Sequence, residues 1–187
     1  MASLTLTSAY RSDPLNGADE LDRCIFGIAQ GDPDALDRLY HDTSASVYSF
    51  ALSILKNSHD AEDVLQDCYL HIHIGAENYR SAGKPMAWIL TITKNLCYQI
   101  LRDRQRTANL PQEDWEPWLA ANEGLSQEDR VVIRQCMEIL TDEERQIVSL
   151  HAVAGFRHRE IAEVLSLPLS TVLSKYHRAI KKLRQHL

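Results

Sequence analysis

The sequence predicts an all-α fold in which two small helical domains are joined by a linker. Apolar residues recur at helical spacing along most of the chain, whereas the alternating pattern of strands is hard to find. Proline, glycine and capping residues mark where these periodic segments begin and end. Between residues 108 and 125 the periodicity breaks at two prolines, one glycine and four acids, which indicates a linker.

Composition limits the class of protein. The chain has 187 residues, 44% of them apolar and 25% charged, which is enough to bury a core in one or two domains. We find no apolar run long enough to cross a bilayer and no secretory leader in the first residues, so we expect a cytoplasmic protein without membrane insertion. The four cysteines, Cys24, Cys68, Cys97 and Cys136, stand singly in apolar stretches, which predicts reduced core residues.

We divide the chain into an N-terminal tail at 1–18, a first domain at 19–107, the linker at 108–125 and a second domain at 126–187. The first predicted helix covers 19–30 and is stopped by Gly31. The segment from Pro33 to about residue 57 is one long helix or two in line.

The third predicted helix is capped by Ser58 or Asp60 and closed by Gly75, and a fourth runs from Pro85 to about Arg106. On a helical wheel the fourth helix has an apolar face and an opposite polar, basic face. The apolar face carries Ile89, Ile92, Leu96 and Ile100, and the polar face carries Thr91, Lys94, Asn95, Tyr98 and Arg102.

The second domain predicts a helix-turn-helix. Its segments are "SQEDRVVIRQCMEIL", "TDEERQIVSLHAVAG", "FRHREIAEVL", a turn "SLP", and "LSTVLSKYHRAIKKLRQHL". Thr141 and Glu144 form a capping box, and Pro168 stands where a helix cannot continue. Two helices across such a short turn are typical of DNA-binding domains, in which the second helix enters the major groove.

Charge is distributed unevenly along the chain. The net charge is −6, yet residues 141–187 hold eight basic and five acidic side chains, and the last thirteen residues hold five Lys or Arg and no acid. An acidic total argues against indiscriminate binding of nucleic acid, because attraction to phosphate supplies most non-specific affinity. The basic helix can also be explained as a complement to its own dipole. Together with the helix and turn before it, it favours DNA contact through Ser170, Thr171, Ser174, Lys175 and Arg178.

Both halves resemble the extracytoplasmic-function sigma factors of bacterial RNA polymerase. The first half is similar in "ALSILKNSHDAEDVLQDCYLHI" and "PMAWILTITKNLCYQILRDRQR", and the second in "LTDEERQIVSLHAVAGFRHREIAEVLSLPLSTVLSKYHRAIKKLR". The tail alone also resembles the helix-turn-helix of LuxR-type activators. The resemblance implies a non-catalytic initiation factor that binds core RNA polymerase at the β′ clamp helices and the β flap. It also implies promoter DNA and an anti-sigma factor as partners, and no cofactor.

The resemblance also implies roles for individual residues. Asp63, Gln66 and Asp67 stand where the family meets the clamp helices, although a solvated acidic face would look the same. The loop and the polar helix face stand where the family captures a flipped base and melted strand of the −10 element. These positions are Asn78, Tyr79, Arg80 and Lys84 in the loop, and Lys94, Asn95, Tyr98 and Arg102 on the helix. The last helix would read the −35 element.

The chain departs from the family pattern at several positions. Many relatives have glycine and lysine where this chain has Ser170 and Leu173, and a leucine can touch a thymine methyl group instead of a phosphate. His71 and His73 do not share a helical face, so with Cys68 they do not predict a metal site.

Two alternatives remain at this stage. One is an ordinary helix-turn-helix regulator that binds DNA without polymerase, and the other is a sigma mimic that docks on an anti-sigma protein. Enzymatic motifs are not found in the sequence, so we expect no catalysis.

Overall fold

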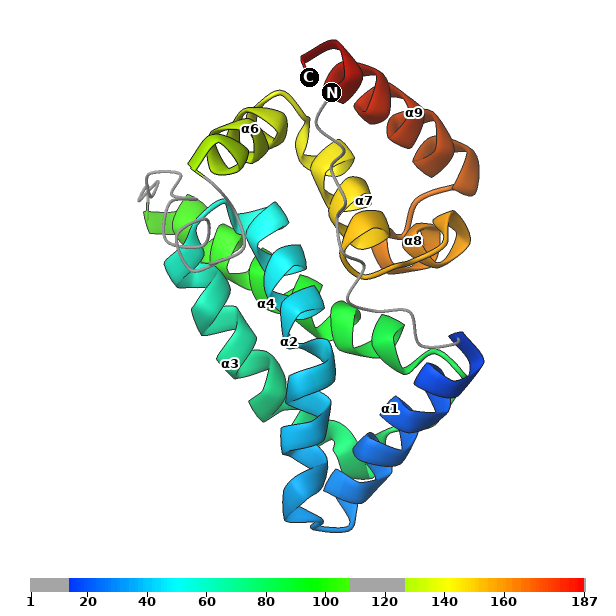
Figure 1. Cartoon of the computed structure of the whole chain (residues 1–187). Helices are drawn as coiled ribbons and strands as arrows, with labels where there is room; N and C mark the ends of the chain where they lie inside the picture. The colour runs from blue at the N-terminus through cyan, green and yellow to red at the C-terminus, as the bar shows by residue number, and fades with distance from the viewer. Residues whose placement is uncertain (1–13, 108–126, 187) are drawn as a thin grey trace.

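The computed structural model describes residues 14–107 and 127–186, and the linker with Trp115 and Trp118 lies outside this part. All regular structure in the described residues is helical, which confirms the predicted fold class (Figure 1). The first domain contains α1 (Pro14–Ala29), α2 (Pro33–Leu55), α3 (Ser58–Gly75), a 3-10 turn η1 (Ala76–Asn78) and α4 (Pro85–Thr107). The second contains α6 (Gln127–Glu138), α7 (Asp142–Ala152), α8 (His158–Leu165) and α9 (Leu169–His186).

The turn between α1 and α2 forms as its sequence predicts. Gly31 has φ +79°, a left-handed conformation that glycine adopts without steric cost. The Asp32 carboxylate accepts a hydrogen bond from Asp34 N at 3.0 Å and caps α2, and Pro33 occupies its first turn. Helix α2 then runs unbroken to Leu55, so the choice between one long helix and two is decided. Helix α1 begins at Pro14, inside the segment that we had set apart as a tail.

The start of α3 corrects one prediction. The cap is Asn57, whose side chain accepts from Asp60 N at 3.1 Å, and not Ser58 or Asp60. Lys56 precedes it in a left-handed conformation with φ 55°, and this reverses the chain so that α3 packs back along α2. Helix α3 ends at Gly75 as predicted, although not through a left-handed turn, because the φ of Gly75 is −82° and the chain continues directly into η1.

The buried face of α4 is rotated relative to the predicted one. Ile89 is fully buried as expected, but the other fully buried side chains are Leu90, Thr93 and Cys97. Thr93 Oγ1 lies 3.4 Å from Cys68 Sγ in the contact with α3, and burial raises the pKa of the Cys68 thiol to about 11. Ile92, Leu96 and Ile100 are only partly buried. The rotation arises because α4 contacts α1, α2 and α3 on one side and α8 on another.

The second domain is built around α7. Thr141 and Glu144 form the predicted capping box, in which Thr141 N donates to the Glu144 carboxylate and Glu144 N donates to Thr141 Oγ1. Lys182 of α9 donates to the same carboxylate at 2.6 Å, so one buried acid joins the start of α7 to the last helix. Ser166, with φ 57°, makes the tight turn from α8 to α9. This turn completes the predicted helix-turn-helix.

The two domains pack against each other. Helix α2 contacts α7 and α4 contacts α8, so that α4 passes beneath the helix-turn-helix (Figure 1). Ser149 Oγ of α7 donates to the Ser49 carbonyl of α2 at 3.3 Å. Lys56 at the end of α2 pairs with Asp142 at 3.1 Å. None of the described helices has the length and apolar character needed to cross a membrane.

Candidate nucleic-acid interface

One exposed stripe runs the length of α3. Asp63, Gln66 and Asp67 are all exposed, as their predicted role requires. The stripe continues with two apolar side chains, Leu70 at 60% exposure and Ile74 at 74%. Positions 63, 67, 70 and 74 share one helical face, so the stripe is acidic in its first turns and apolar in its last turns. Sequence reasoning missed Leu70 and Ile74, although their spacing from Asp67 was the signal that could have found them.

The loop between η1 and α4 is anchored by a residue that we had predicted to contact DNA. Tyr79 is only 5% exposed, and its ring lies between Phe26 and Trp88 with centroid distances of 5.7 and 4.6 Å. Its hydroxyl donates to Asp22 Oδ1 of α1 at 2.5 Å. Tyr79 therefore cannot offer its ring to a base in this structure, and we remove it from the contact residues.

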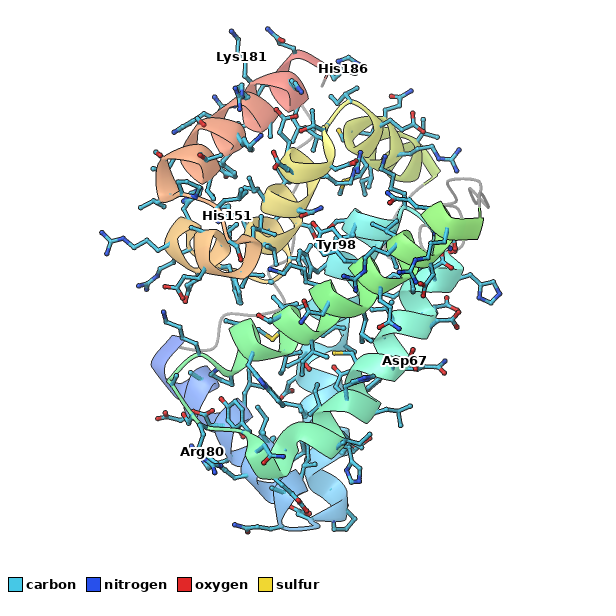
Figure 2. All side chains as sticks on the ribbon, turned by 180° about the vertical axis from the view of Figure 1, so that it is seen from behind. Asp67, Arg80, Tyr98, His151, Lys181 and His186 are labelled. Atoms are coloured by element: carbon cyan, nitrogen blue, oxygen red, sulfur yellow. The ribbon has the colours of Figure 1, made fainter. Side chains whose placement is uncertain are left out.

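The neighbours of Tyr79 point outward. Asn78 and Arg80 are exposed, and Arg80 lies at the surface of the loop, far from Asp67 on α3 (Figure 2). The Arg80 guanidinium donates to the carbonyl of Tyr79 at 3.1 Å and approaches that of Glu77 at 3.5 Å. These contacts hold the cation close to the loop and leave it at the surface.

Two predicted contact lysines are engaged by the other domain. Lys84 Nζ lies 2.6 and 2.8 Å from the two carboxylate oxygens of Glu163 on α8. Lys94 Nζ donates to the Val164 carbonyl, also on α8, at 2.5 Å. Burial at this contact lowers the pKa of Lys94 from its ordinary value. Lys84 belongs to the predicted loop and Lys94 to the predicted helix face, but in this arrangement both cations are bonded to α8.

The remaining predicted residues of α4 are open to solvent. Asn95 and Arg102 are exposed, and Tyr98 is 43% exposed part-way along the helix (Figure 2). Arg104, two residues after Arg102, forms an ion pair with Asp60 of α3. The basic residues after Tyr98 thus divide between a surface role and the packing of α4 on α3.

The first turns of α9 present a small polar surface. Ser170, Ser174 and Arg178 are exposed, Leu173 is 37% exposed and Thr171 is half-buried. Ser174 Oγ donates to the Thr171 carbonyl at 3.0 Å, which leaves its lone pairs available. Lys175 is paired with Glu143 of α7, so its charge is partly neutralised within the domain.

Two family models match the chain, one over the first domain and the other over the second. Residues 39–107 match Sigma-70 region 2, and residues 130–183 match Sigma-70, region 4. The chain belongs to the sigma-70 family of sigma factors. Such a protein directs RNA polymerase to promoters, and the regulator alternative is not favoured because region 2 precedes the helix-turn-helix.

Curated relatives named ECF RNA polymerase sigma factors match the chain over almost their whole length. They support an extracytoplasmic-function (ECF) member of the sigma-70 family. The chain is 26% identical over 178 residues to the ECF RNA polymerase sigma factor SigK of Mycobacterium ulcerans, covering 91% of this chain and 95% of the relative. It is 27% identical over 192 residues to the SigK of Mycolicibacterium vanbaalenii, covering 99% of this chain and 97% of the relative.

Solved structures of sigma factors share the fold. CnrH, in complex with the cytosolic domain of CnrY, superposes with a TM-score of 0.65 at 20% identity, over 89% of this chain and 96% of that chain. The sigma factor RpoE of Bartonella quintana, in complex with the anti-sigma factor NepR, has a TM-score of 0.65 at 19% identity, over 82% and 96%. At these identities the likeness concerns the fold alone.

Two further cations of this sigma factor escaped the sequence prediction. Arg157 and Arg159 are exposed at the start of α8, the first helix of the helix-turn-helix. In this motif the first helix crosses the DNA backbone, where arginine binds phosphate well. The sequence signal for these two cations is the segment "FRHRE", which is less basic than the last helix.

A cluster of aromatic rings joins the three helices of the sigma helix-turn-helix. His151 of α7 stacks on His158 of α8 at 4.8 Å, and Tyr176 of α9 meets both rings edge-on at 4.9 and 4.6 Å. His151 Nδ1 lies 2.8 Å from the Phe156 carbonyl. Burial, followed by the nearby His151 and His177, lowers the pKa of His158. The packing of the three rings therefore favours the neutral form of His158.

Proposed function

We propose that this sigma factor uses three separate surfaces to bring RNA polymerase to a promoter. The exposed stripe of α3 binds core polymerase, the loop before α4 and the polar face of α4 hold the melted −10 element, and α9 reads the −35 element. Asp67 on α3 and Arg80 in the loop lie far apart, and Lys181 marks the last helix, α9 (Figure 2).

The observation that carries this proposal is the chemistry of the α3 stripe. An exposed helix face with Asp63 and Asp67 followed by Leu70 and Ile74 is complementary to a partner helix with basic residues beside apolar ones. Leu70 and Ile74, 60% and 74% exposed, lie one turn apart and together place a small apolar patch beside the acids. The clamp helices of polymerase are the partner that the family assignment supplies.

The −10 surface is proposed to work through an outward loop and a cationic helix. Asn78 and Arg80 are the loop residues that can meet a flipped base, and Tyr98 offers an exposed ring on which a base can stack. Lys94 and Arg102 supply charge for the strand backbone. Because Lys94 is bonded to α8, single-stranded DNA gains this cation only when the helix-turn-helix moves away from α4.

The −35 surface is proposed to combine hydroxyl groups, one arginine and one leucine. Ser170 can donate to a phosphate or a base edge at the start of α9, Ser174 Oγ can accept from a base amino group, and Arg178 can bind a phosphate. Leu173 is 37% exposed at the position from which an apolar side chain can reach a thymine methyl group. Arg157 and Arg159 would add phosphate contacts from α8. We therefore expect a −35 preference that includes thymine.

We also propose an anti-sigma protein as a partner. The RpoE structure was solved with the anti-sigma factor NepR, which supports the existence of such partners for this fold. In this chain the apolar end of the α3 stripe, Leu70 and Ile74, would be covered by such a protein, because a contact there excludes polymerase.

The test is run-off transcription by core RNA polymerase on a library of promoter fragments, with and without this chain. Specific transcripts that appear only when the chain is added are expected. The α3 stripe is tested with the triple variant Asp63→Asn, Gln66→Ala, Asp67→Asn. The three replaced side chains are exposed, so the variant should fold normally. Loss of transcripts with this variant supports the α3 stripe as the polymerase contact. Equal transcription by variant and wild type would refute that assignment.

A further inference from the structure

A single carboxylate of α1 holds the loop before α4 in place. Asp22 Oδ1 accepts from the Tyr79 hydroxyl at 2.5 Å, and Asp22 Oδ2 accepts from Ser81 Oγ at 2.5 Å. Each oxygen of Asp22 thus binds a different loop residue. Both bonds link positions more than fifty residues apart, so they fix the loop to α1 and not merely to its own backbone.

The surroundings of Tyr79 make this anchor strong. Its ring is buried between Phe26 and Trp88, and its pKa is raised far above the ordinary value, first by burial and then by the bond to Asp22. The raised pKa keeps the phenol in its neutral form, in which it donates to Asp22. A charged acceptor facing a buried neutral donor forms one of the stronger kinds of hydrogen bond.

The second bond governs the other half of the loop. Ser81 Oγ donates to Asp22 and accepts from Gly83 N at 3.3 Å, and Gly83 itself has φ +71°. The left-handed glycine turns the chain toward α4. Ser81 thereby links Asp22 to the backbone just before α4, the helix with the remaining residues of the proposed −10 surface.

Arg80 lies between the two anchored residues. Tyr79 and Ser81 turn their side chains toward Asp22, and the side chain between them projects to solvent, as expected for an extended segment. The surface position of Arg80 is therefore set from both sides by one acid (Figure 2). Asp22 is on α1, outside residues 39–107, which match the region 2 model.

We propose that Asp22 is a positioning residue for recognition of the −10 element. It touches no DNA; it fixes the backbone of the loop so that Asn78 and Arg80 meet one base in one geometry. The proposal rests on the proposed function of the loop and adds the residue on which its base discrimination depends. Discrimination at a base requires contacts held in a defined geometry, because a loosened contact tolerates the wrong base as well as the right one.

The experiment compares holoenzymes that contain wild type, Asp22→Asn, or Asp19→Asn. Asp19 is exposed on the same helix, so its variant matches the change in charge without changing the loop. A promoter selected by run-off transcription is altered one base at a time in its −10 element, and the rate of open-complex formation is measured on each. For Asp22→Asn we expect the preference for the best base to fall about fivefold or more, the lower end of what one base contact contributes. Asp19→Asn should match wild type.

A second pair of variants tests whether Asp22 acts through the loop. In the double variant Tyr79→Phe, Ser81→Ala both donors are removed, and adding Asp22→Asn to it should change discrimination no further. Affinity for core polymerase and −35 preference should be unchanged in all of them, since those surfaces are on α3 and α9.

Some results would overturn the proposal. One is a fall in the melting temperature or in polymerase affinity of Asp22→Asn with unchanged base discrimination, which means a purely structural role. Another is an additive effect of Asp22→Asn in the double variant, which means a different route. If wild type directs no promoter-specific transcription, the proposed function itself fails, and that outcome is distinct because it does not depend on any Asp22 variant.

Discussion

Replacing Glu163 with glutamine is expected to open the contact between the two domains. The Glu163 carboxylate binds Lys84 across the α4–α8 contact, and the two side chains are 55% and 49% exposed. Ion pairs with this exposure contribute about 0.2 to 1 kcal/mol. Since 1.36 kcal/mol corresponds to a factor of ten, the ratio of open to closed molecules is expected to rise about 1.4-fold to fivefold.

Opening should be incomplete, because other contacts across the domains remain. Lys94 still donates to the Val164 carbonyl, and Ser149 still donates to the Ser49 carbonyl. The exposed ion pair is also screened by salt, which the more buried Lys94 bond resists better. Raising the salt concentration should therefore open wild type toward the level of Glu163→Gln and should open the variant less.

The assay is single-molecule energy transfer between dyes on the two domains of the free protein. His41 on α2 and Lys181 on α9 are exposed positions for the dyes, which unnatural amino acids can carry without labelling the cysteines. Glu143→Gln is the control, because it removes the same charge from an ion pair inside the second domain. Equal opening of both variants, or no opening by Glu163→Gln, would refute the reasoning that the Lys84 pair holds the domains together.

The remaining predictions concern polymerase, promoter and pH. Asp67→Asn should weaken binding to core polymerase several-fold in a titration at low salt and less at high salt, and an unchanged affinity would contradict a charged contact. Arg178→Gln should weaken binding of holoenzyme to all promoters alike, whereas Leu173→Lys should change the preferred −35 base; selection from a promoter library tells these effects apart. Because folding lowers the pKa of His158 from 6.5, His158 takes up a proton in the unfolded chain at a higher pH than in the folded protein. The melting temperature of wild type should fall as the pH decreases below about 6.5, and that of His158→Gln should fall less. An equal fall in both proteins would contradict this prediction.

Much of the fold was predictable because its determinants are local. The turn at Gly31, the capping box of Thr141 and Glu144, and the helix-turn-helix each depend on residues within a few positions of one another. The cap of α3 was predicted wrongly because the local sequence offers more than one capping residue. Three capping residues stand close together at its start, and only the left-handed Lys56 selects Asn57.

The site was predictable in outline but not in its tertiary contacts. Tyr79 looks like a base-stacking residue in the sequence, yet the packing of Phe26 and Trp88 buries it. Lys84 is in the predicted loop and Lys94 on the predicted helix face, but their bonds to α8 join residues 79 and 70 positions apart. No local pattern reports such partners, and the same is true of Asp22.

The central claim is that this chain reads promoters as a subunit of RNA polymerase. Its most direct test is the binding of one labelled promoter fragment and one scrambled fragment by the chain alone, by core polymerase alone and by the two together. With a net charge of −6 and two small DNA surfaces, the chain alone should bind both fragments weakly and equally, and only the mixture should prefer the promoter. Tight, promoter-specific binding by the chain alone, unchanged when polymerase is added, would contradict the account.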